Sequence, residues 1–343
     1  MSEQGITQSD TSPLVVAGFE DALKRLVQRV QTQECPSFDA VPLDHEGRPN
    51  GGSPHLADVL WVGGGSPSGG IRWRPSESVR RAIEALPSLR WVHTDSVGID
   101  HLPLVELRQR GIVVTNGGDN FARPMAEWVV LAMLAAVKNL PAFVRYSDDG
   151  YWARGLFQDE LQGKVALMLG LGSFAQVAAK LLEPFGVEVV ALVRNPRSPG
   201  AVHSVRLVHG DRWRDELPRT DFLVAGLPLT PSTEGIVDTE VLGALHPAAW
   251  LINFARGKLV GQAELITALD AGTIGGAVLD AFPEEPLRSG HSLWGRPNVL
   301  VLPHSTWFSP HVGERAERRF VAQLWRWVKK EPLVGSRDLE AGY

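Results

Sequence analysis

Short apolar runs alternate with stretches of helical spacing in the first third of the chain. Four such runs predict strands, at 14–17, 58–62, 89–94 and 112–115. Between them, the segments 20–30 and 76–86 carry apolar residues at helical spacing. Strands that alternate with helices are typical of a parallel sheet covered on both faces. The turn-rich segment 44–54 is expected to form a surface loop.

The alternation resumes after a long helical pattern at 124–139, which opens with a proline suited to a first helical turn. Seven further runs predict strands, at 165–169, 187–193, 205–208, 222–225, 250–253, 276–279 and 299–302. Helical segments at 174–185 and 262–271 lie between them, and a last one covers 310–328. Because that last helix follows the second sheet, we expect it to return to the first domain. The predicted domains are 1–120 with 306–343, and 121–305.

Composition and charge exclude several classes of protein. The net charge is -5, whereas general nucleic-acid binders carry a basic excess. Cys35 is the single cysteine, so the chain has no disulfide framework and no multi-cysteine zinc site; no metal is expected. The first ten residues lack the pattern of a signal peptide, and the longest apolar run, 128–137, is too short for a bilayer. A cytoplasmic protein without membrane contact is expected.

A glycine-rich turn follows the first predicted strand of the second domain. It reads G-x-G-x-x-A, with Gly170, Gly172 and Ala175 in the three positions, and a helical segment follows. Gly170 allows a tight turn, Gly172 lets the backbone approach a pyrophosphate, and Ala175 allows close helix packing. The phosphates are expected at the start of that helix, beside Ser173 and Phe174. A bare structural turn is the alternative, but the strand and helix around the motif favour a dinucleotide site.

The end of the next strand bears on the choice of dinucleotide. NAD-preferring sites usually have an acidic residue there, which binds the ribose hydroxyls. This chain has Val193 and Arg194 instead, and Arg197 follows. The arginines are interpreted as a clamp for a 2′-phosphate, the alternative being two solvated surface side chains.

Three further motifs place titratable groups just after predicted strands. Arg256 lies in N-x-x-R-G, Glu285 precedes a proline, and His304 follows one. Arginine offers a planar fork for a carboxylate, and histidine exchanges a proton near neutral pH. A carboxylate beside that histidine stabilises its charged form and fixes its tautomer. The three residue types can together bind a carboxylate and transfer a proton.

At these motifs the sequence resembles the D-isomer-specific 2-hydroxyacid dehydrogenase family, over about residues 55–328. The resemblance implies that Arg256 binds the substrate carboxylate, that Glu285 tunes the catalytic histidine, and that His304 is the acid/base. Asp280 and His304 are also expected to contact the cofactor. The implied fold is α/β, with a flavodoxin-like substrate domain and a Rossmann-type, doubly wound dinucleotide-binding domain.

The resemblance extends to other segments. Val97 and Gly98 match a segment whose backbone holds the substrate carboxylate. Pro228 and Thr233 match a cofactor-contacting loop, and Ala255 is placed beside the cofactor. Trp307 stands where small residues are common, and two alternatives stay open: it closes the site around a small or apolar substrate, or it packs between domains.

The implied function is reduction of a small 2-oxoacid, such as glyoxylate or hydroxypyruvate, to the D-2-hydroxyacid. The missing acid favours NADP(H), with NAD(H) as the alternative. A homodimer is expected, because the helix at 124–139 is too apolar for full exposure and the family pairs through this region. The alternative is a non-enzymatic NAD(P)-sensing protein like the corepressors that resemble this family.

Overall fold

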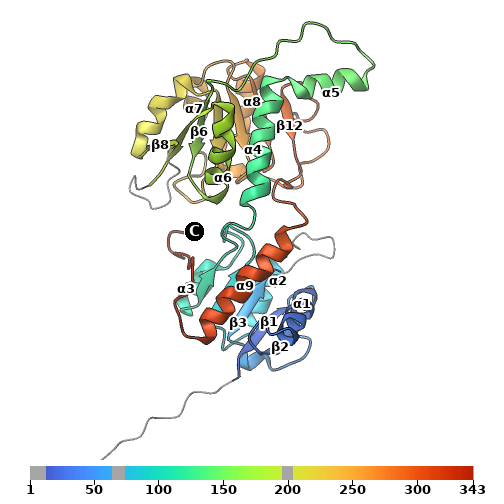
Figure 1. The fold of residues 1–343 in the computed structure, drawn as a ribbon, viewed down its shortest axis with the longest axis vertical. Helices are drawn as coiled ribbons and strands as arrows, with labels where there is room; N and C mark the ends of the chain where they lie inside the picture. Colours follow the sequence, from blue (N-terminus) through green and yellow to red (C-terminus); the bar gives the residue numbers. More distant parts are fainter. Residues whose placement is uncertain (1–12, 64–73, 195–203, 343) are drawn as a thin grey trace, which may run out of the picture. The chain divides into compact units, whose positions relative to one another are not determined.

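The chain divides into two units (Figure 1). The structure is a computed structural model, and it describes residues 13–63, 74–194 and 204–342. One unit comprises residues 1–120 and 310–343, and the other comprises 121–309. The return to the first unit thus comes four residues later than the 306 expected from the sequence. Residues 305–307 stay with the second unit because they are hydrogen-bonded to Asp280 and His304, as described below.

The described part of the first unit contains one sheet of five parallel strands, in the order β2-β1-β3-β4-β5. The strands are β1 (Val15–Phe19), β2 (Asp39–Leu43), β3 (Val59–Val62), β4 (Trp91–Thr94) and β5 (Val113–Thr115). Its helices are α1 (Glu20–Gln31), η1 (Pro54–Leu56), α2 (Ser76–Glu84), α3 (Leu104–Gln109) and α9 (Val312–Val328). This strand order is that of flavodoxin-like folds, which confirms the predicted class.

The C-terminal helix α9 completes the core of the first unit, and Figure 1 shows it beside the sheet. Its Phe320 is fully buried, stacked on Trp61 with ring centroids 4.6 Å apart and tilted against Trp91 at 5.5 Å. Glu317 on the same helix forms ion pairs with Arg25 and Arg29 of α1. The helix is therefore an integral part of a unit that the chain leaves at residue 120 and rejoins only at residue 310.

The described part of the second unit contains one sheet of seven parallel strands, in the order β12-β11-β10-β9-β6-β7-β8. The strands are β6 (Val165–Leu169), β7 (Glu188–Leu192), β8 (Val205–Val208), β9 (Phe222–Ala225), β10 (Trp250–Asn253), β11 (Gly276–Leu279) and β12 (Val299–Val301). The order reverses between β6 and β9, as in doubly wound dinucleotide-binding folds. The Rossmann-type prediction is confirmed.

Helices cover both faces of this sheet. The helices of the described part of this unit are α4 (Ala122–Val137), α5 (Leu140–Asp148), α6 (Ser173–Leu182), η2 (Glu183–Phe185), η3 (Gly210–Arg219), α7 (Thr239–Ala244), η4 (Gly257–Leu259) and α8 (Gln262–Asp270). Alternate residues of each strand face opposite clusters: Ala166 and Met168 of β6 pack with α4 and α6, and Leu167 and Leu169 pack with α7 and α8. Figure 1 shows α4 and α6 side by side.

The segment after α4 carries exposed apolar side chains. Helix α4 gives way to α5 at Asn139, which has φ +53°. Trp152 is 82% exposed and Phe157 79%, in a stretch after α5 that extends from the unit (Figure 1). In the described chain no single helix is long and apolar enough to cross a membrane; α4 and α5 reach that length only together, with a 71° bend.

Phe320→Ala tests the place of α9 in the first core. Removing a fully buried phenylalanine leaves a cavity between Trp61 and Trp91, so the free energy of unfolding of this unit should fall by about 3–5 kcal/mol. Urea denaturation followed by tryptophan fluorescence measures the change. Arg318→Ala, on an exposed position of the same helix, should have a small effect. Equal losses for both variants would contradict this account of the core.

Candidate active site

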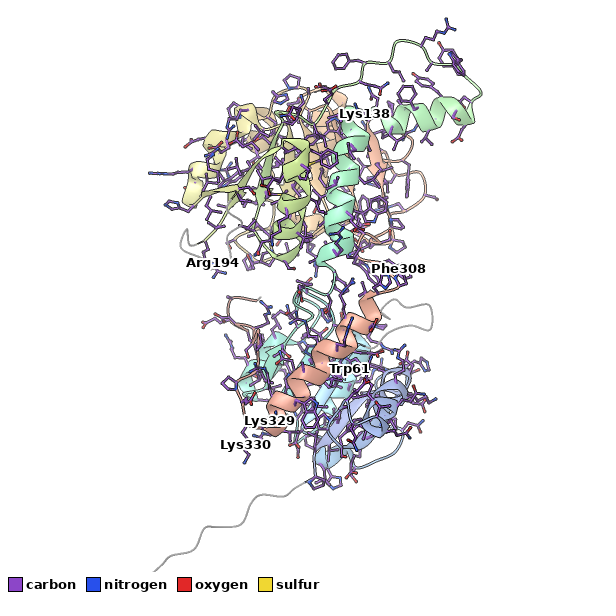
Figure 2. All side chains as sticks on the ribbon, in the orientation of Figure 1. Trp61, Lys138, Arg194, Phe308, Lys329 and Lys330 are labelled. Atoms are coloured by element: carbon purple, nitrogen blue, oxygen red, sulfur yellow. The ribbon has the colours of Figure 1, made fainter. Side chains whose placement is uncertain are left out.

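The site residues predicted in the second unit share one edge of its sheet. Strands of a parallel sheet end at the same edge, and each of these residues follows such an end. Gly170 follows β6, Arg194 follows β7 and Pro228 follows β9. Arg256, Asp280 and His304 follow β10, β11 and β12 in the same way. Figure 2 shows Arg194 and Phe308 at this end of the unit and Lys138 at the opposite end.

The glycine-rich turn lies where the strand order reverses. Gly170 has φ +100°, a conformation that favours glycine. A Cβ there would also lie 3.0 Å from the carbonyl oxygen of Gly226, which follows the neighbouring strand β9. Gly172 is the N-cap of α6, and a Cβ on it would meet none of the described atoms within 4 Å. The start of α6 therefore leaves room for a phosphate, and the residues fit a dinucleotide.

The other predicted cofactor contacts lie at the start of α6 and in the loop after β9, and they differ in which of their atoms can reach a ligand. Phe174 is buried in the apolar cluster with α4, so only its backbone can serve a cofactor, whereas Ser173 opens α6. The Thr233 hydroxyl donates to the Pro228 carbonyl over 2.6 Å and accepts from the Thr230 N–H over 2.8 Å. Thr233 thereby fixes the shape of the loop that follows β9.

Only part of the arginine pair can be placed. Arg194 is exposed and directly follows Val193, whose side chain is buried. Arg197 lies outside the described residues. Position and charge of Arg194 suit a phosphate at this edge.

The loop that carries Arg256 is held from two sides. Asn253 is buried; its amide donates to the Arg256 carbonyl over 2.9 Å, and its oxygen accepts from the Ala255 N–H over 3.2 Å. A Cβ on Gly257 would overlap the backbone of Phe282. The N-x-x-R-G motif thus has a structural explanation: the asparagine shapes the loop, and the glycine lets it lie against the loop after β11.

His304 and Glu285 form a hydrogen-bonded pair. The His304 Nδ1 lies 2.8 Å from the Glu285 Oε2, and the Glu285 Oε1 accepts the Phe282 N–H over 2.9 Å. The bond to Glu285 raises the pKa of His304 above its usual value, against burial and the charge of Arg256. Burial favours neutral Glu285, but the bonds from His304 and Phe282 outweigh it and lower the Glu285 pKa. The geometry favours a protonated imidazole beside a carboxylate.

Asp280 acts on the backbone after His304. Its carboxylate is buried and accepts from the Ser305 N–H over 2.7 Å, the Thr306 N–H over 3.0 Å and the Thr306 hydroxyl over 2.6 Å. The sequence predicts a cofactor contact here, whereas both carboxylate oxygens bind the 305–306 segment. Asp280 therefore positions the chain that carries His304.

Val97 and Gly98 belong to the first unit and are described there alone. They lie in the loop after β4, where Val97 is 41% exposed. The Ser96 hydroxyl donates to the Gly98 carbonyl over 2.9 Å, and the Asn116 amide donates to the Val97 carbonyl. These bonds fix the backbone on which the predicted carboxylate contact depends.

The residues that sequence reasoning missed are those that support others. Gly226 and the backbone of Phe282 act through contacts between distant loops, at Gly170 and Gly257. The glycine of the R-G pair was the available signal for the close approach to Phe282.

Among the described residues, no group of three or more His, Cys, Asp or Glu side chains could hold a metal ion.

Comparison with known proteins decides the family. The model described as "D-isomer specific 2-hydroxyacid dehydrogenase, NAD binding domain" matches residues 130–306, just over half of the chain. The chain belongs to the D-isomer-specific 2-hydroxyacid dehydrogenase family. A glyoxylate/hydroxypyruvate reductase of Arabidopsis thaliana is 34% identical over 263 residues, which are 75% of this chain and 79% of the relative.

Two solved structures are similar over nearly the whole chain. One, from Xanthobacter autotrophicus Py2 in complex with NADPH and MES, is 27% identical with a TM-score of 0.79 and covers 97% of this chain and 100% of its own. The other, an NADPH-dependent glyoxylate/hydroxypyruvate reductase of Sinorhizobium meliloti in complex with NADP and sulfate, is 26% identical with a TM-score of 0.76 and the same coverage. These relatives are dehydrogenases or reductases, so the non-enzymatic alternative has no support.

Glu285→Gln tests the coupling within the pair. Loss of the carboxylate should lower the pKa of His304 toward its usual 6.5. Because the pKa of His304 is higher in the folded than in the unfolded protein, the pair with Glu285 stabilises the folded state. This stabilisation is fully present below the usual histidine pKa and is lost as the pH rises through the pKa of the folded protein. NMR titration of the imidazole, assigned with His304→Gln, measures the shift. Glu284→Gln, on an adjacent exposed carboxylate, is the control; an equal effect there would contradict the pairing.

Proposed function

We propose that this dehydrogenase is an NADPH-preferring reductase that converts a small 2-oxoacid of the glyoxylate or hydroxypyruvate type to the D-2-hydroxyacid. The observation that carries the proposal is the His304–Glu285 pair, close enough to Arg256 for its charge to act on both, at the edge that bears the glycine-rich turn. The Arabidopsis and Sinorhizobium relatives, both named for glyoxylate and hydroxypyruvate, support the substrate class.

The residues divide the reaction between them. Arg256 offers its planar fork to the substrate carboxylate. His304, whose Nδ1 is engaged with Glu285, is left with Nε2 to deliver a proton to the carbonyl oxygen. Glu285 stabilises the imidazolium before that transfer and fixes its orientation. Gly170, Gly172 and the start of α6 would hold the nicotinamide cofactor, which supplies the hydride when bound.

A panel of 2-oxoacids with NADPH tests the reaction, with cofactor oxidation as the readout. Glyoxylate and hydroxypyruvate should be reduced, and His304→Ala should lower kcat at least ~100-fold with NADPH binding little changed. Arg256→Lys keeps the charge and loses the fork, so KM for the oxoacid should rise sharply. Near wild-type turnover in His304→Ala would remove this residue from the mechanism, and an unchanged KM in Arg256→Lys would place the carboxylate elsewhere.

The preference for NADPH rests on Val193 and Arg194 at the end of β7. Val193 offers no carboxylate to the ribose hydroxyls, and Arg194 is exposed where a 2′-phosphate would bind. The complexes of the Xanthobacter and Sinorhizobium relatives with NADPH and NADP support this choice. Charge-assisted hydrogen bonds contribute about 1.5–3 kcal/mol, and exposure reduces this, so a roughly tenfold to hundredfold preference is expected.

Arg194→Ala combined with Arg197→Ala tests this preference. KM for NADPH should rise while KM for NADH changes little, and the wild-type preference should shrink as salt increases. Lys138→Ala, which removes a positive charge from the opposite end of the unit in Figure 2, controls for net charge. If the wild-type protein has the higher kcat/KM with NADH, the arginines are not a phosphate clamp.

A homodimer is also part of the proposal. The sequence places the pairing on the helix at 124–139, but α4 buries much of its surface against α6. Apolar side chains more exposed than Leu131 of α4, which is 42% exposed, lie on α5 and after it: Val144 is 51% and Trp152 82% exposed. Light scattering at micromolar concentration should give twice the chain mass of 37.4 kDa, and Trp152→Ser with Phe157→Ser should reduce it. A monomeric wild-type protein refutes this assembly.

The cytoplasmic location remains a prediction.

A further inference from the structure

The peptide group between His304 and Ser305 is fixed at both ends. Its carbonyl accepts the indole N–H of Trp307 over 2.8 Å. Its N–H donates to the Asp280 Oδ1 over 2.7 Å. Because a peptide group is planar, two bonds at opposite ends define its orientation. His304 itself has φ +52°, a conformation that residues other than glycine adopt only when their surroundings impose it.

We propose that Trp307 is a positioning residue for His304, whose indole N–H holds the backbone so that the imidazole stays aligned with Glu285. The inference rests on the proposed function, in which His304 donates the proton. With Asp280 alone, the peptide is held only at its N–H and can tilt about that bond. The bond from Trp307 removes this freedom at the carbonyl, which belongs to His304 itself.

The indole is itself held in place by aromatic neighbours. Its ring centroid lies 5.7 Å from that of Phe121 and 5.7 Å from that of Phe308, the latter edge-on. A tryptophan supported in this way can act as a rigid donor. This assigns Trp307 a function different from the two that its position in the sequence suggests, which were closure around the substrate and packing between domains.

Trp307 is neutral, so the charges that act on His304 come from other side chains. They are Glu285 and Asp280, which favour the protonated imidazole, and Arg256, which opposes it. Substituting the neutral indole leaves all three in the chain. Burial lowers the pKa of His304, so a loss of burial in a Trp307 variant would raise it; a lower pKa therefore reports a loss of alignment with Glu285.

Trp307→Phe removes the donor and keeps an aromatic ring. We expect kcat to fall about three- to tenfold, with KM for the oxoacid and Kd for NADPH within twofold. Reduction requires protonated His304, so the pH above which kcat declines should move down, toward the corresponding pH of Glu285→Gln.

Incorporation of 3-benzothienylalanine at 307, which retains the size of the indole without its N–H, should give the same result if the phenylalanine variant folds poorly. Trp325→Phe is the matched control, since it loses an indole bond to the Glu34 carbonyl in the first unit.

The outcomes separate this inference from the proposed function. Unchanged kcat and pH profile in both 307 variants would overturn it, as would a rise in KM at constant kcat, which indicates contact with substrate. If the wild-type protein and Trp325→Phe reduce no 2-oxoacid, the proposed function fails. Positioning is then decided by NMR titration of His304: a lower pKa in the 307 variants supports it, and an unchanged pKa overturns it.

Discussion

The candidate site depends on the hydrogen bonds made by one loop, which follows β11 from Asp280 to Glu285. Asp280 holds the backbone after His304, and Glu285 holds its imidazole. From the other side, Gly257 brings the loop with Arg256 against Phe282. The loop thus contacts both the segment that carries the Arg256 guanidinium and the segment that carries the His304 imidazole, which follow different strands. The two carboxylates lie five residues apart and have separate functions. Asp280 binds the backbone of residues 305 and 306, and Glu285 raises the pKa of the His304 imidazole.

Much of the fold could be predicted because both faces of each sheet are covered. Strands buried in this way are continuous apolar runs, and β6, β9 and β10 have the predicted limits. The missed strand β2 lies at the edge of its sheet and contains Pro42, which is tolerated only there. Helix α5, one of the helices missed, begins after Asn139, whose left-handed conformation separates it from α4. Apolar spacing does not reveal that conformation.

The site was predictable where chemistry is concentrated in motifs, and unpredictable where it depends on contacts between distant segments. Residue type and spacing marked Arg256, Glu285 and His304, because few side chains suit a carboxylate and a proton. The partners of Asp280 lie 25 and 26 residues away, on a neighbouring strand's loop. Only the register of β11 with β12 brings them together, and a local sequence pattern does not determine that register.

The return of α9 to the first unit sets an order of assembly during synthesis. The strands of the first sheet are made early, but Phe320, which lies against Trp61 and Trp91, is made only after the whole second unit. The second unit is continuous in sequence and can fold while the ribosome is still translating the last helix. Until that helix emerges, the nascent first sheet exposes two large indoles. The apolar core of the first unit is therefore completed only at the end of translation.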